Sequence, residues 1–211
     1  MRRTIPPSRC LLSALIIIFG LSAVSHPVAA IPFAGDGLVV HGKGTTTTPF
    51  YRNYTSITNV FGAQLAVPVA SATIRYVTVE TSTVRDEAMA AVISTTGVLY
   101  VFRFSANVWA LQWSVSVGNR ATQNMDMAYE QSSGDLVVAY SGNVATTNEL
   151  RYRVWNGTSW SGATNLDATR TSGNVYGVKL ASCPGNDDLG LACFDSNNDL
   201  STRYWDGSIN T

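Results

Sequence analysis

The chain has 211 residues and no formal net charge, with 14 Lys and Arg against 14 Asp and Glu. Three arginines lie within the first 30 residues, so 14 − 3 = 11 basic residues remain against 14 acidic ones, a net charge of 11 − 14 = −3. No run of like charge is long enough for a nucleic-acid footprint, which argues against DNA or RNA as a partner. The low charge content suits an extracellular β protein.

The first 30 residues have the features of a secretory signal. Three arginines precede an apolar run from Leu11 to Val24, and the small residues Val28 and Ala30 follow at the spacing of a cleavage site. The run is shorter than the ~20 residues that a spanning helix needs, so an uncleaved membrane anchor is the less favoured alternative. We therefore expect residues 1–30 to be removed, leaving a secreted, periplasmic or extracellular chain without a membrane segment.

Beyond residue 30, short segments rich in β-branched and aromatic residues alternate with Gly, Asn, Asp and Ser, a pattern typical of all-β proteins. Three copies repeat one order of strands. The expected strands are 74–80, 88–93, 99–104 and 108–115 in the first copy, 124–130, 136–140, 150–155 and 159–166 in the second, and 175–181, 189–194 and 200–205 in the third. Leu99, Leu150 and Leu200 recur 51 and 50 residues apart, and Arg52 marks an earlier partial copy. The period predicts a repeated four-stranded antiparallel unit.

The second strand of each copy is apolar at nearly every position, so it must be covered on both faces. The third strand mixes polar and apolar residues and is expected nearer the outside. It is followed by Asn156-Gly157 in one copy and Asp206-Gly207 in the next. These dipeptides favour tight hairpins in which both central residues have positive φ.

These repeats resemble β-propeller blades, and the turn over residues 155–160 resembles a degenerate Asp-box of sialidase-type blades. It lacks the leading Ser and the residue between the acidic position and the Gly. The resemblance implies an all-β, propeller-like array of four-stranded antiparallel blades of about 50 residues. The expected repeat domain spans 31–211, with a partial blade at 37–66 and blades at 74–115, 124–166 and 175–211.

The 211 − 30 = 181 residues after the signal hold about 3.6 such periods, whereas propellers usually close with about four to eight blades. The strands therefore form either a small four-bladed ring or the front portion of a longer propeller, and we favour the second. A pair of β-sandwiches is the alternative fold, which the regular period does not favour.

A non-catalytic recognition or adhesion module that binds an extracellular glycan or protein is the first functional hypothesis. Tryptophan rings can stack on sugars, and they can equally fill the gaps between neighbouring sheets, which their recurrence at the repeat spacing favours. The candidate ligand-binding residues are Trp109, Trp155, Trp160 and Trp205, with Trp113 as a further ring of the same kind.

A sialidase-like glycoside hydrolase or a lyase of propeller type is the alternative. The resemblance implies arginines that bind a substrate carboxylate and a tyrosine with an acidic partner. The repeated arginines lie in third strands, away from the inner strands where catalytic groups of such folds cluster, so we expect them to pair with acids or to stack on aromatics. These arginines are Arg52, Arg103, Arg153 and Arg203. The candidates for a carboxylate pair are Asp86, Glu87, Asp126 and Glu130.

Other chemistry has little support in the sequence. His41 is the one histidine after the signal, which argues against a histidine-assisted hydrolase and a zinc site. Alternating oxygen-bearing side chains at Asp195, Asn197 and Asp199 could converge on calcium. An ordinary solvated turn is the preferred interpretation, because no bidentate Glu follows, so we expect no cofactor.

Two cysteines of the third copy raise the question of a disulfide, which export permits. A hairpin centred on residues 184–187 places Cys183 opposite Asp188, and Cys193 opposite Val178 or a near neighbour. About five residues at ~3.3 Å each would then separate the two cysteines, beyond the reach of a disulfide. We expect two free thiols, with Cys193 buried; a bridge stays open only if the register differs.

Overall fold

The computed structural model describes residues 37–68, 70–118, 121–144, 149–166 and 173–207, and the backbone of residues 209–210. The predicted signal over residues 1–30 lies outside these ranges. Every regular element in the described part is a β-strand. None of the described residues forms a helix long and apolar enough to cross a membrane.

The strands pair antiparallel in four sheets, which we call A to D. Sheet A contains β1 (Gly37–His41), β2 (Phe50–Thr55), β3 (Val60–Phe61) and β4 (Leu65–Ala66). Sheet B contains β5 (Ile74–Thr81), β6 (Ala88–Ser94), β7 (Val98–Ser105) and β8 (Val108–Ser116). Sheet C contains β9 (Met125–Tyr129), β10 (Leu136–Ser141), β11 (Leu150–Trp155) and β12 (Thr164–Leu166). Sheet D contains β13 (Val175–Ser182), β14 (Leu189–Asp195), β15 (Leu200–Trp205) and β16 (Ile209–Asn210).

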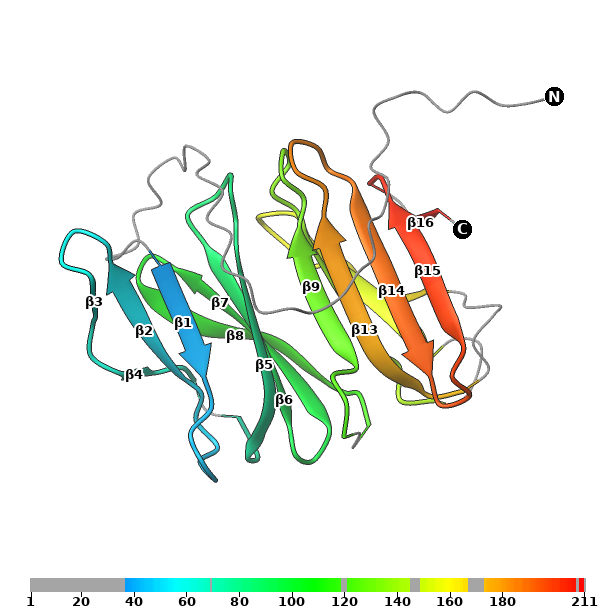
Figure 1. Cartoon of the computed structure of the whole chain (residues 1–211), viewed down its shortest axis with the longest axis horizontal. Coiled ribbons are helices and arrows are strands. Elements are labelled where there is room, and N and C mark those ends of the chain that lie inside the picture. Colours follow the sequence, from blue (N-terminus) through cyan, green and yellow to red (C-terminus); the bar gives the residue numbers. More distant parts are fainter. Residues whose placement is uncertain are drawn as a thin grey trace.

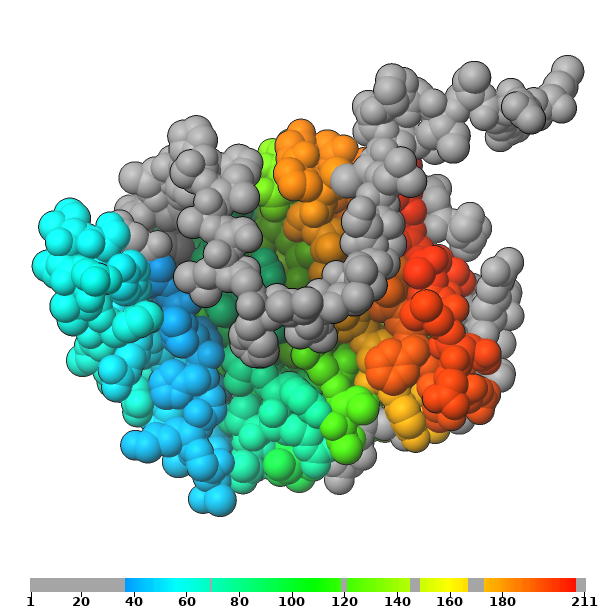
Figure 2. Space-filling view, in the orientation of Figure 1, coloured from blue at the N-terminus to red at the C-terminus, as the bar shows by residue number. Residues whose placement is uncertain are grey.

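The sheets stack face to face in chain order, with sheet A at one end and sheet D at the other (Figures 1 and 2). In sheets B to D the strands follow one another in sequence, and β5, β9 and β13 lie side by side as the first strand of each sheet (Figure 1). In sheet A, β1 and β2 correspond to the second and third strands of the other sheets. Arg52 lies opposite the third residue of β1, as Arg153 lies opposite the third residue of β10.

The strand register confirms the repeat. Leu99, Leu150 and Leu200 each lie opposite the sixth residue of the preceding strand, and the aromatic residue five positions later lies opposite its first residue. The third strands therefore occupy equivalent places in sheets B, C and D. One predicted strand is too long. Of residues 159–166, only 164–166 form a strand, β12, whereas Trp160 forms an isolated bridge with Trp155 that closes a turn.

The core lies between the sheets. The second strands β6 and β10 are buried at every position, as their continuous apolar sequence predicts. Leu99 and Leu150 are 0% and 1% exposed because each faces the next sheet along the chain, whereas Leu200 is 72% exposed. Phe194, which lies opposite Leu200 on the same face of sheet D, is exposed as well.

Candidate functional site

Two tryptophans and two arginines come together between sheets B and C. Gln112 and Trp113 belong to β8, Arg151 and Arg153 to β11, and Trp160 to the turn after β11. We call these five residues the β8–β11 cluster. All five are half-buried, so the cluster is packed against the core and still reaches the surface.

A β-bulge in β8 sets the direction of its two side chains. Trp113 lies opposite Val101 and Leu111 lies opposite Phe102, so Gln112 is the extra residue. A bulge re-aims the side chains beside it. The result is that the Gln112 amide oxygen accepts a hydrogen bond from Trp160 Nε1 at 3.3 Å, while the Trp113 ring meets the Trp160 ring edge-on at 5.4 Å.

The two arginines lie on the face of β11 that is turned toward sheet B. They are two residues apart and therefore share one face of the strand. Arg151 lies opposite Tyr140 and Arg153 opposite Val138, and both of these partners belong to the core between sheets B and C. The guanidinium carbon of Arg153 lies 5.0 Å from the centre of the Trp113 ring. This stacking fixes the plane of the guanidinium.

The turn over residues 155–160 holds Trp160 in the cluster. The Asn156 amide oxygen accepts backbone hydrogen bonds from Thr158 at 3.0 Å and Ser159 at 2.9 Å. Gly157 has φ 90°, whereas Asn156 has no positive φ, so the expected turn with two positive φ values is wrong. The side-chain bonds of Asn156 hold the turn instead, and the Trp155 and Trp160 rings end 5.6 Å apart.

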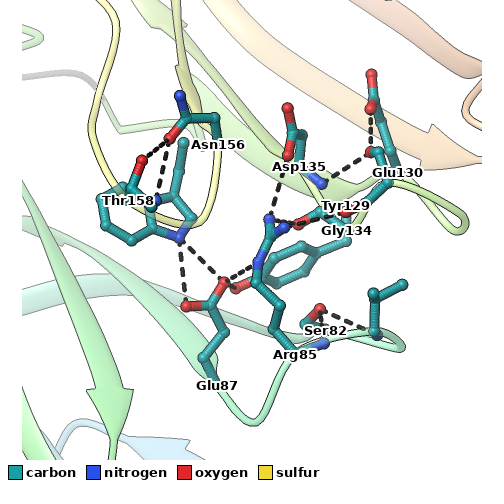
Figure 3. Close-up of polar contacts among 12 residues, drawn as sticks. Ser82, Arg85, Glu87, Tyr129, Glu130, Gly134, Asp135, Asn156 and Thr158 are labelled. Carbon is teal, nitrogen blue, oxygen red and sulfur yellow. Dashed lines mark hydrogen bonds and ion pairs between the residues drawn. The ribbon is translucent and has the colours of Figure 1, made fainter.

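Beneath this turn, Glu87 joins sheets B and C (Figure 3). Its side chain is fully buried and accepts hydrogen bonds from Arg103 Nε at 2.7 Å and Trp155 Nε1 at 3.0 Å. Arg85 Nε lies 3.2 Å away, and the Tyr129 hydroxyl donates at 3.3 Å. Burial and the neighbouring Glu87 carboxylate raise the pKa of Tyr129, which keeps the phenol as a hydrogen-bond donor. The network anchors the Trp155 ring on which the cluster rests.

Comparison with known proteins identifies the fold. No family model and no curated protein matches the sequence. A structure of a mutant Aleuria aurantia lectin with Fucα1-6GlcNAc superposes with TM-score 0.56 at 16% identity, over 82% of this chain and 56% of that chain. The fucose-specific lectin from Aleuria aurantia in its mercury-derivative form gives TM-score 0.56 at 16% identity, over 82% and 55%. NanB with Optactamide gives 0.50 at 13% identity, over 80% and 28%.

The sheets are blades of a β-propeller. This confirms the fold expected from the sequence. The chain spans about half the length of the lectins that it matches. We refer to the sheets below as blades A to D.

Most of the predicted ligand-binding tryptophans fill spaces between blades. Trp109 is 7% exposed and packs against Tyr51 of blade A, 5.8 Å away, and Phe104. Trp155 and Trp205 are 4% and 6% exposed. Of the four candidates, Trp160 alone is half-exposed and belongs to the cluster.

The sequence interpretation missed the participation of Gln112 and Arg151. The available signal was the alternation of Arg151 and Arg153, which places two charges on one face of a strand. The expectation that repeated arginines pair with acids or stack on aromatics is confirmed at Arg103, which bonds Glu87 and lies 4.9 Å over the Trp155 ring. The expectation of stacking on an aromatic ring is also confirmed at Arg153, which lies over the Trp113 ring.

The structure does not unite the predicted carboxylates in one site. Glu87 is enclosed between blades B and C, and Asp86 beside it is exposed. Glu130 accepts hydrogen bonds from the Ser133 hydroxyl and Trp205 Nε1. The carboxylate oxygens of Glu87 and Glu130 therefore accept hydrogen bonds that join neighbouring segments of the chain.

Asp126 belongs to a different group on the first strands of the blades. Asp126 of β9 lies 3.5 Å from Lys179 Nζ of β13, and its carboxylate accepts the Leu180 backbone N–H at 3.0 Å. Burial raises the pKa of Asp126. Burial and then the Asp126 charge raise the pKa of Glu80 on β5 to about 7. Glu80 was absent from the predicted candidates, because only the meeting of three strands reveals its setting.

In the predicted calcium loop, the Asp195 carboxylate already accepts backbone hydrogen bonds from the loop itself and from Gly173. Asp195 is 1% exposed, and its carboxylate accepts N–H groups of Gly173, Asn197 and Asp199 at 2.9, 2.9 and 3.0 Å. These bonds use the oxygens that a cation would need. Within the described ranges, no group of three His, Cys, Asp or Glu could hold a metal ion.

The two cysteines of blade D do not bridge each other. Cys193 is free and buried opposite Val178, and the Cys183 N–H bonds the Asp188 carbonyl at 2.8 Å, as the predicted register requires. Cys183 is disulfide-bonded, so the expectation of a second free thiol is wrong. That expectation considered only a bridge within the hairpin, whose geometry does exclude one.

A cavity of about 330 Å³ lies where the first strands of blades B and D begin. Its walls are mainly apolar and aromatic, and they include Tyr76, Tyr176, Phe194 and Leu200. Burial raises the pKa of Cys193, which also lines the cavity, to about 11, so this residue is an unreactive thiol at neutral pH. The β8–β11 cluster, by contrast, combines aromatic rings with two guanidinium groups and an amide, and we therefore take it as the candidate site.

Proposed function

We propose that the chain is an exported, non-catalytic module that binds glycans at the β8–β11 cluster. The observation that carries the proposal is the pairing of half-exposed Trp160 and Trp113 with two arginines and an amide on neighbouring blades. Aromatic rings bury the apolar face of a sugar. Guanidinium and amide groups donate hydrogen bonds to its oxygens.

The comparisons support a glycan as the partner. The fucose-specific Aleuria aurantia lectin has similar blades, and its likeness to this chain at 16% identity concerns the fold. Export by the predicted signal over residues 1–30 is part of this proposal, and it would bring the chain to extracellular glycans. Binding without turnover is favoured because the carboxylates of Glu87 and Glu130 already accept hydrogen bonds from neighbouring segments.

A glycan array probed with the purified chain tests the proposal. We expect binding to a defined subset of glycans, and a loss of about tenfold or more in affinity for Trp160→Ala, since one aromatic anchor carries a large share of such contacts. Phe61→Ala is the matched control, because Phe61 is an aromatic of blade A that is 48% exposed and remote from the cluster. Its binding should equal that of the unmodified chain.

Two results would overturn the proposal. One is a Trp160→Ala variant that stays folded and binds every glycan as the unmodified chain does. The other is catalytic release of 4-methylumbelliferone from a sialoside or another glycoside, since turnover is incompatible with a non-catalytic module. Thermal unfolding of each variant separates lost binding from lost folding.

A further inference from the structure

We infer that the glycan bound at the β8–β11 cluster is acidic and carries a carboxylate or a sulfate ester. The inference rests on the proposed glycan-binding function and adds the charge of the ligand to it. It follows from three donors of the cluster that find no acceptor among the residues that the structure describes.

The three donors face the space between blades B and C, Arg151 and Arg153 from one face of β11 and Trp113 from β8. Arg151 Nε, Arg153 Nε and Trp113 Nε1 are each buried, and none has a hydrogen-bond partner among the described residues. A buried donor without an acceptor costs free energy, so native proteins rarely leave one unpaired. Three in one place indicate a ligand that offers several acceptor oxygens.

The charge of the cluster narrows the choice of ligand. Neither Arg151 nor Arg153 forms an ion pair with a described carboxylate. By contrast, Arg103 of the same inter-blade space bonds the buried Glu87 at 2.7 Å. Here the protein supplies an acid where an arginine has a structural role. Arg151 and Arg153 are two neighbouring guanidinium groups for which the described chain supplies no acid. They suit an anionic ligand, because guanidinium groups bind carboxylate and sulfate-like groups in a planar, paired geometry.

The arginine pair is not a feature of every blade. Arg151 lies opposite the fifth residue of β10, and the same place holds Tyr100 in blade B and Ser201 in blade D. The place of Arg153 holds Phe102 in blade B, but Arg52 in blade A and Arg203 in blade D, so it is Arg151 that makes the pair particular to blade C. The blades form without the pair in those places, so the fold does not require it in blade C.

Binding of matched sugars by the full chain tests the inference. The probes are methyl β-D-glucuronide against methyl β-D-glucoside, galactose 6-sulfate against galactose, and α-methyl-L-fucoside as a further neutral sugar. Titration calorimetry should give affinities at least about tenfold higher for the acidic member of one pair, because hydrogen bonds to charged groups are the stronger ones. The preferred pair distinguishes a carboxylate from a sulfate. Added salt should weaken the acidic ligand more than the neutral one.

A double variant assigns that preference to the cluster. Arg151→Gln with Arg153→Gln should bring the acidic sugar down to the affinity of its neutral partner. It should change the midpoint of thermal unfolding little, since Arg151 Nε and Arg153 Nε donate to no described acceptor and the amide introduced by Arg153→Gln can still lie over the Trp113 ring. Arg52→Gln is the matched control, because Arg52 is an exposed arginine at the equivalent register of blade A. That variant should keep the preference.

The outcomes are distinct. Equal affinity for the acidic and neutral members of both pairs overturns the inference and leaves the proposed function standing. A preference for acidic sugars that survives in the double variant also overturns it, because the anionic group of the sugar then binds to other residues. Absence of binding to any glycan ends both proposals.

Discussion

Replacing Glu87 by alanine should remove a buried acceptor on which two blades depend. The carboxylate is fully buried and lies 2.7 Å from Arg103 Nε and 3.2 Å from Arg85 Nε. Trp155 Nε1 donates to it at 3.0 Å and the Tyr129 hydroxyl at 3.3 Å. The four donors come from blades B and C, so the variant loosens the contact between them.

The size of the effect follows from what each donor loses. Removing one partner of a buried ion pair costs about 3–5 kcal/mol, because the other charge stays uncompensated. The side chains of Arg85 and Arg103 are 24% and 30% exposed and can regain part of their hydration in the variant. The loss of their ion pairs therefore contributes about 3 kcal/mol, the lower end of this range. The buried Trp155 indole loses an acceptor, at about 1 kcal/mol. We expect Glu87→Ala to lower the free energy of unfolding by about 4 kcal/mol and Glu87→Gln by about 2 kcal/mol.

Urea unfolding followed by tryptophan fluorescence measures these differences. Asp86→Ala is the control, since Asp86 is the adjacent acid and is exposed; its free energy of unfolding should stay within about 0.5 kcal/mol of the unmodified chain. If Glu87→Ala changed the unfolding midpoint no more than Asp86→Ala does, the Glu87 network would not hold the blades together, and the reasoning would be refuted.

Three further predictions concern blades B and D. A Cβ added at Gly177 would lie 1.9 Å from a ring carbon of Phe194, so Gly177→Ala should destabilise by about 1–3 kcal/mol in urea unfolding, and Phe194→Ala should relieve the effect. The pKa of Glu80, raised from 4.5 to about 7, means that the folded chain binds its proton more tightly than the unfolded chain, so stability should fall as pH rises from 4.5 to 7. Thermal unfolding from pH 4 to 8 should lose part of this slope in Glu80→Gln; an unchanged slope contradicts the assignment. Cys193, with a pKa of about 11, should react with a disulfide reagent at pH 8 only after denaturation, and rapid reaction of the native chain would contradict its burial.

The strands and their register could be predicted because burial constrains them. A strand such as β6, apolar at every position, must lie inside a sheet that is covered on both faces. Once the period aligned Leu99, Leu150 and Leu200, a slip of one residue would have turned each strand over, so the register followed. The pairing of Cys193 with Val178 is confirmed for the same reason.

The candidate site could not be predicted in this way, because it depends on contacts between blades. Trp113 and Arg153 are far apart in the sequence and meet only through the stacking of blade B on blade C. The bulge at Gln112 leaves no clear mark in the alternation of β8. The roles of the tryptophans differ for a similar reason: Trp155 and Trp160 close the same turn, yet only the second reaches the surface.

The contrast between repeated and unrepeated positions separates structure from function. Trp155 and Trp205 occupy the same place in blades C and D, and each donates its indole N–H to a buried carboxylate of the preceding blade. The acids come from different places, since Glu87 precedes the second strand of blade B and Glu130 follows the first strand of blade C. The hydrogen bond is thus retained although its acceptor changes, as expected of a bond that joins blades. Arg151 shows the opposite behaviour, because blades B and D have another residue in its place and its buried Nε has no hydrogen-bond partner among the described residues. A residue that the fold neither repeats nor pairs is best explained by a ligand.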